Sequence, residues 1–234
     1  MFGMIFDPTY LLLVALPTML LSGLAQWYVR SSYAKWLAQR NTLGLTGTDV
    51  ARRIIEVTSE LRGVRLESTP GELSDHFDPR DNTVRMSPNI AQKPSVASMA
   101  IVAHELGHAQ QYAEKSALIT LRQFLMPAVQ LSPNIAYGLI LFGILARVTG
   151  LLWLGILVFG LTVVFMLLTL PVEIDASRRG LILLREAGLM QTDTDSGGAR
   201  QVLTAAALTY VAAAVSSLLT LLYYVMLARR SNRN

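Results

Sequence analysis

The 234-residue sequence contains no cysteine and only three histidines, and charged residues make up just 15% of it. The absence of cysteine excludes a disulfide framework, a thiolate zinc site, an iron–sulfur cluster and a cysteine nucleophile. Soluble domains carry about 25% charged residues, whereas 52% of this chain is hydrophobic. The composition therefore excludes a disordered chain and most soluble enzymes, and it favours a membrane protein.

Four stretches lack Asp, Glu, Lys, Arg and His for long enough to cross a lipid bilayer, which requires about 20 mostly apolar residues. These stretches are Pro8–Val29, Gln123–Ala146, Val148–Val172 and Gln201–Ala228. We predict one transmembrane helix over each of them. The fold class is accordingly mainly α, a four-pass helical membrane protein, and the polar segments 30–122 and 173–200 fall on the same side of the bilayer.

The basic residues are distributed unevenly between the two sides. Sixteen of the twenty Lys and Arg residues lie in the two polar segments, and the formal net charge of the chain is +4. Because basic residues accumulate in cytoplasmic loops, this distribution predicts that both polar segments face the cytoplasm. The flanking positions of the basic residues account for the positive charge, so we expect no nucleic-acid partner.

Within segment 30–122 the pattern predicts a small α+β domain. Two short strands are expected over Val64–Glu67 and Thr83–Ser87, joined by the turn-rich sequence SDHFDPRDN over Ser74–Asn82. A helix is expected to begin near Pro94, which is a favourable residue for a first turn. The sequence QTDTDSGG over Gln191–Gly198 predicts a loop.

The helix expected to begin near Pro94 carries the motif His104-Glu105-Leu106-Gly107-His108, an H-E-x-x-H match. Residues at i and i+4 share one face of a helix, so both imidazoles can reach one metal ion. Glu105 is then placed to take a proton from a metal-bound water, whose pKa zinc lowers to about 7. The motif predicts one zinc ion per chain, with His104 and His108 as ligands and Glu105 as the catalytic base.

A hydrolytic zinc site requires a third protein ligand. Glu173 is the preferred candidate, because a carboxylate at the end of a membrane pass is costly without a functional partner. Asp175 is the alternative ligand, or a hydrogen-bond partner of a ligating histidine. His76 is a further alternative, whereas Glu114 is expected to point along the helix and away from the metal.

Other side chains are candidates for substrate or oxyanion contacts, namely His76, Tyr112 and Arg178. We predict in addition that Thr83–Ser87 forms an edge strand, which could pair with an extended substrate backbone.

Three segments in this order, DHFDPR…VRMS, HELGHAQQ and PVEIDASRRG, resemble the YugP-like neutral zinc metallopeptidases of bacterial membranes over nearly the whole chain. The resemblance implies a zincin-like, gluzincin-like domain with zinc, a downstream glutamate ligand and peptide-bond hydrolysis at the bacterial inner membrane. Related membrane proteases carry E-x-x-x-D downstream, whereas here residue 177 is Ser, which leaves Glu173 and Asp175 both open.

The sequence therefore predicts a membrane zinc endopeptidase that cleaves peptides or membrane-associated proteins at the cytoplasmic surface. The sequence is also compatible with a membrane-protein partner or with a homo-oligomer. One alternative is a site-2-type intramembrane protease with Asp175 as third ligand. The other is a catalytically silent membrane adaptor in which zinc braces the fold.

Overall fold

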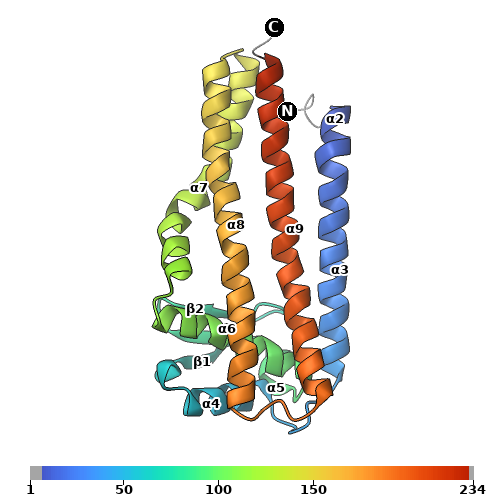
Figure 1. The fold of residues 1–234 in the computed structure, drawn as a ribbon, viewed down its shortest axis with the longest axis vertical. Helices are drawn as coiled ribbons and strands as arrows, with labels where there is room; N and C mark the ends of the chain where they lie inside the picture. Colours follow the sequence, from blue (N-terminus) through green and yellow to red (C-terminus); the bar gives the residue numbers. More distant parts are fainter. Residues whose placement is uncertain (1–6, 232–234) are drawn as a thin grey trace. The chain divides into compact units, whose positions relative to one another are not determined.

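The computed structural model describes residues 7–231, which are mainly helical (Figure 1). The elements in chain order are α2 (Pro8–Tyr10), the π-helical turn η1 (Leu11–Ala15), α3 (Leu16–Ala38), α4 (Gly47–Val57), the 3₁₀ turn η2 (Ser59–Leu61), β1 (Arg65–Ser68), β2 (His76–Asp78), β3 (Thr83–Met86), α5 (Pro88–Gln92), α6 (Val96–Ala113), α7 (Ala117–Leu145), α8 (Thr149–Glu186) and α9 (Asp193–Ser231).

Four helical stretches are long and apolar enough to cross a membrane, so the four predicted stretches are helical. They are Pro8–Ala38, Ala117–Leu145, Thr149–Glu186 and Asp193–Arg230. Large apolar side chains point outward from them, including Leu12, Met19 and Leu157 with exposed fractions of 65%, 72% and 71%. Such extensive apolar exposure is unusual for a protein surrounded by water and fits contact with lipid.

The helices extend beyond the uncharged stretches. Helix α8 continues past Val172 to Glu186, so Glu173 is part of a continuous helix. The prediction of a loop over Gln191–Gly198 is wrong, because α9 already begins at Asp193. Here the side chain of Thr192 accepts a hydrogen bond from the Asp195 N–H. Acidic residues in the first turn also favour a helix N-terminus, so this polar sequence starts a helix.

Contacts divide the chain into two compact units. The helical unit contains the residues up to Ala25, Thr120–Pro171 and the residues from Thr209 onward. The polar unit contains Gln26–Ile119 and Val172–Leu208. Helices α3, α7, α8 and α9 each contribute residues to both units.

The polar unit contains a three-stranded sheet with the order β1-β3-β2. Strand β3 pairs in parallel with β1 and antiparallel with β2. The predicted strands at Val64–Glu67 and Thr83–Ser87 are present with slightly shifted ends, but β2 lies in the segment predicted only as a turn. Because β2 occupies the second side of β3, the prediction that Thr83–Ser87 forms an edge strand is wrong.

Helix α6 lies in the core of the polar unit. Twelve of its eighteen residues are buried, among them the fully buried Met99 and Leu106. The helix begins after Ser95, whose side chain accepts a hydrogen bond from the Ser98 N–H. Because α6 is enclosed by the core, its side chains have fixed positions.

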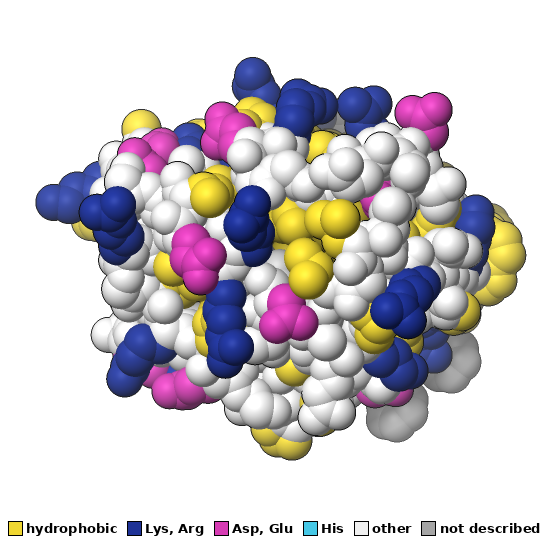
Figure 2. All heavy atoms as spheres, turned by 90° about the horizontal axis from the view of Figure 1, so that it is seen from below, with side chains coloured by type: hydrophobic (Ala, Val, Ile, Leu, Met, Phe, Trp, Pro, Cys, Tyr) yellow, Lys and Arg dark blue, Asp and Glu magenta, His cyan; other side chains and the backbone are white. Residues whose placement is uncertain are grey.

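The end of the molecule shown in Figure 2 has basic and acidic side chains interspersed, as is usual for a surface in water.

Helices α6 and α8 approach each other closely at two glycines. A Cβ atom on Gly107 would lie 2.4 Å from the carbonyl oxygen of Ala176, and one on Gly180 would lie 2.8 Å from the carbonyl oxygen of Ala103. Both distances are far below van der Waals contact. The two backbones therefore touch only because both positions lack a side chain.

We predict that Gly180→Ala destabilises the protein, because the new methyl group collides with backbone atoms of α6. Overpacking of this kind costs about 1–3 kcal/mol. Gly197→Ala is the matched control, since no atom lies within 4 Å of a Cβ built at this helical position. The control should be neutral or should gain up to about 1 kcal/mol. Urea unfolding in detergent measures both variants, and equal stability of the two would contradict the close crossing.

Candidate metal centre

Two imidazoles of α6 form one side of a cluster in the polar unit. The ring centroids of His104 and His108 lie 4.7 Å apart with an interplanar angle of 82°. Their side chains are only 13% and 12% exposed. The two histidines share one helix face, as their i, i+4 spacing predicts.

Glu173 of α8 completes the cluster. Its Oε2 atom lies 3.3 Å from Nε2 of His104 and 3.4 Å from Nε2 of His108. The three residues are the group whose ligand atoms lie within 4.8 Å of one another in the described part of the chain. Ligand atoms about 2.0–2.1 Å from a tetrahedral zinc ion lie about 3.3 Å from each other. The two distances from the Glu173 oxygen therefore fit zinc.

The electrostatics of Glu173 also favour a cation. The residue is 3% exposed, and its buried Oε2 atom has no hydrogen-bond partner among the described residues. A buried carboxylate is strongly destabilising unless positive charge or hydrogen-bond donors face it, and the two imidazole nitrogens are the groups that face this one. A metal ion held by this oxygen and the two imidazole nitrogens would remove that penalty.

A buried glutamine orients one of the imidazoles. Gln111 is 1% exposed, and its Nε2 atom donates hydrogen bonds to the carbonyl of Val172 at 2.9 Å and to Oδ2 of Asp175 at 2.8 Å. Both amide hydrogens are thereby used, so Oε1 must be the acceptor in its 3.0 Å contact with Nδ1 of His108. His108 then carries a proton on Nδ1, which leaves Nε2, the nitrogen next to Glu173, as the one that can bind a metal ion.

Asp175 lies behind this glutamine, outside the three-residue cluster. Its Oδ2 atom accepts hydrogen bonds from Gln111 and, at 2.7 Å, from Nε of Arg179. Arg179 also pairs with Glu114 at 2.8 Å. Asp175 is therefore connected to His108 through Gln111, by two successive hydrogen bonds. On the other imidazole, Oγ of Ser177 lies 3.2 Å from Nδ1 of His104.

Glu105 is buried on the strand side of the cluster. Its Oε2 atom accepts a hydrogen bond of 2.9 Å from the backbone N–H of Phe77 in β2. Burial raises the pKa of the Glu105 carboxyl, while the neighbouring imidazoles and the Phe77 N–H act in the opposite direction. Since the Phe77 N–H bonds to Glu105, the outer edge of β2 is the sheet edge that faces α6.

The remaining predicted site residues lie at the margin of this arrangement. His76 is exposed, and its Nδ1 atom contacts the carbonyl of Ser74 at 2.8 Å. Tyr112 is half-buried, and its ring centroid lies 5.4 Å from that of Phe77. Arg178 is exposed. The structure does not bring these three residues into the cluster.

Sequence reasoning missed Gln111 and Phe77. The position of Gln111, three residues after His108 on the same helix face, was the available signal for a partner of that imidazole. Phe77 had no signal, because its contribution is a backbone N–H.

Comparisons with known proteins give a consistent result. Residues 10–229 match the family described as "Putative neutral zinc metallopeptidase". The chain is 38% identical over 207 residues to the "Putative membrane protease YugP" of Bacillus subtilis (strain 168), covering 88% of this chain and 91% of that protein. No solved structure matches the chain.

We predict that Gln111→Leu weakens zinc binding by about 10–100-fold, the usual effect of removing a hydrogen-bond partner of a ligating histidine. Gln110→Leu makes the same chemical change one position earlier, at a half-buried site, and should leave the affinity nearly unchanged. Competition with a chromophoric chelator measures both variants, with urea unfolding as the check on folding. Equal zinc affinities of the two variants would show that Gln111 does not position His108.

Proposed function

We propose that the chain, which belongs to the family described as "Putative neutral zinc metallopeptidase", is a membrane zinc endopeptidase that binds one zinc ion. His104, His108 and Glu173 would hold the metal. The observation that carries this proposal is the buried Glu173 oxygen at 3.3 and 3.4 Å from the two imidazole nitrogens. Two imidazoles and one carboxylate are a donor set found in hydrolytic zinc sites.

Zinc, when bound, supplies a Lewis acid that polarises the scissile carbonyl and lowers the pKa of water. The residues of the chain then handle the proton. Glu105 accepts a proton from the attacking water on its carboxylate and returns it to the leaving amine. The raised pKa of the buried Glu105 carboxyl suits this exchange, because a general base is most effective when its pKa is close to the working pH.

The substrate class follows from the place of Glu173 in the chain. Glu173 comes directly after the uncharged stretch that ends at Val172 and belongs to the same helix, α8. We propose that the site acts at the membrane surface, on peptides or proteins associated with the bilayer. The concentration of basic residues in segments 30–122 and 173–200 supports a cytoplasmic location of the site.

We predict that Glu105→Gln lowers peptide hydrolysis about 100-fold or more, because the base is removed while the metal ligands stay. Zinc content should stay at the wild-type level. Glu114→Gln is the matched control, since this exposed carboxylate pairs with Arg179 and does not contact the cluster. Cleavage of a fluorogenic peptide library by the detergent-solubilised protein gives the rates. Undiminished hydrolysis by Glu105→Gln would refute the proposed mechanism.

The orientation can be tested directly, because the wild-type chain has no cysteine that would react in the background. We predict that Val148→Cys, in the short connection between α7 and α8, reacts with a membrane-impermeant maleimide on intact bacteria. Arg62→Cys, on the exposed surface of the polar unit, should react only after the cells are permeabilised. Reaction of Arg62→Cys on intact cells would place the polar unit outside the cytoplasm.

A further inference from the structure

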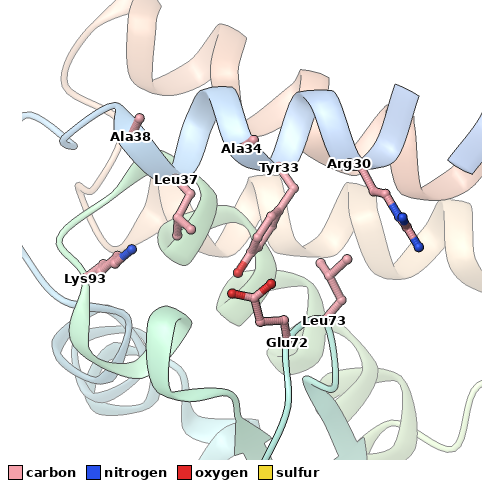
Figure 3. A pocket seen from close by; sticks show the side chains of 8 residues that line it. All are labelled: Arg30, Tyr33, Ala34, Leu37, Ala38, Glu72, Leu73 and Lys93. Atoms are coloured by element: carbon pink, nitrogen blue, oxygen red, sulfur yellow. The ribbon is translucent and has the colours of Figure 1, made fainter. Parts of the chain in front are cut away.

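The polar unit contains a second site, a cavity of about 750 Å³. Its walls come from the C-terminal part of α3, from the connection between β1 and β2, and from Lys93, which follows α5 (Figure 3). The lining residues that define its chemistry are Arg30, Tyr33, Leu37, Glu72, Leu73 and Lys93. The cavity shares no lining residue with the His104, His108 and Glu173 cluster.

An unsatisfied phenol lies in this cavity. Tyr33 is only 8% exposed, and its hydroxyl makes no hydrogen bond of good geometry to a described residue, although the Asn89 side chain is a polar neighbour of it. Figure 3 shows the ring reaching from α3 toward Glu72. Buried tyrosine hydroxyls normally have a hydrogen-bond partner. An unpartnered hydroxyl in a cavity therefore points to a ligand that supplies this partner.

The charged groups indicate what kind of ligand fits. Arg30 and Lys93 are cations, and neither forms an ion pair with a described residue. Glu72 places a carboxylate between them, with Oε1 accepting a hydrogen bond of 2.9 Å from Nδ2 of Asn89. Two cations beside one carboxylate suit a ligand that carries a single negative charge next to a positively charged hydrogen-bond donor.

The position of the cavity along α3 connects it to the bilayer surface. Arg30 directly follows the uncharged stretch Pro8–Val29. The wall from Arg30 to Ala38 covers about 12 Å of helix at about 1.5 Å per residue. The head-group layer of a bilayer is about 5–8 Å thick on each side. If α3 crosses the membrane, the wall of the cavity begins at the depth of the lipid head groups.

The connection between β1 and β2, which lies opposite α3, adds an apolar side chain to the cavity wall. Leu73 has a backbone φ of 54°, a left-handed conformation that is uncommon for leucine, and its side chain is 46% exposed. Leu73 therefore adds an exposed apolar side chain to the wall of the cavity.

We propose that this cavity binds the head group of a phospholipid with a phosphodiester and a primary ammonium, as in phosphatidylethanolamine. Arg30 holds the phosphate, the Tyr33 hydroxyl one helical turn later donates to a phosphate oxygen, and Lys93, at the other end of the cavity, adds positive charge at a distance. Glu72 accepts a hydrogen bond from the ammonium group, and Leu73 covers the start of the acyl chains. The site rests on the crossing of the membrane by α3 and is independent of peptide hydrolysis.

The experiment is native mass spectrometry of the full chain in detergent, titrated with dioleoyl phosphatidylethanolamine, phosphatidylglycerol and phosphatidylcholine. Phosphatidylethanolamine should bind at least tenfold more tightly than phosphatidylcholine, because choline has no N–H to donate to Glu72. Water-soluble glycerophosphoethanolamine should bind more weakly than the lipid. Equal affinity for all three lipids, a preference for phosphatidylglycerol, or equal binding of the soluble head group would overturn the proposal.

Variants assign the contacts. Arg30→Gln should weaken binding of phosphatidylethanolamine at least fivefold and Lys93→Gln by a smaller factor, whereas Arg53→Gln, on the exposed face of α4, should not change it. Glu72→Gln should remove the preference over phosphatidylcholine. Tyr33→Phe keeps the buried ring and tests the hydroxyl alone, with a severalfold loss expected. Unchanged binding in these four cavity variants, with unchanged thermal unfolding, would refute the assigned site.

Discussion

The contact between α6 and α8 at Gly107 and Gly180 is the constraint on which the candidate metal centre depends. The two histidines are fixed by the burial of α6, but their distance from Glu173 is set by how closely the other helix can approach. A side chain at either glycine would collide with backbone atoms of the opposite helix. The 3.3 and 3.4 Å spacings are therefore a property of helix packing as much as of the motif.

Polar contacts brace the same helix crossing. Gln111 binds His108 on its own helix and both Val172 and Asp175 on α8, so one buried amide links the orientation of an imidazole to the placement of the carboxylate next to Val172. The exposed ion pair between Arg179 and Glu114 adds a weaker connection between α6 and the same helix. Strand β2 contributes separately, through the backbone N–H that holds Glu105. Three elements thus converge on one buried cluster.

The parts of this arrangement that could be predicted from the sequence are those governed by local periodicity. The four apolar helices and the shared face of His104 and His108 follow from runs and spacings of residues. The short strand β2 could not be predicted, because three residues in a turn-rich segment become a strand only through pairing with β3. Gln111 gains its role only from a helix that lies 61 residues later in the chain. Contacts that depend on tertiary packing leave little trace in local sequence.

The most direct test of the account is the zinc content of the purified protein, measured by inductively coupled plasma mass spectrometry for the wild type, Glu173→Ala, Asp175→Ala and Glu114→Ala. The account predicts about one zinc ion per chain in the wild type and its loss in Glu173→Ala, because a third protein ligand is required. Glu114→Ala should keep its zinc, and Asp175→Ala should bind it more weakly. Full zinc occupancy in a folded Glu173→Ala variant would contradict the assignment of α8 as the source of the third ligand.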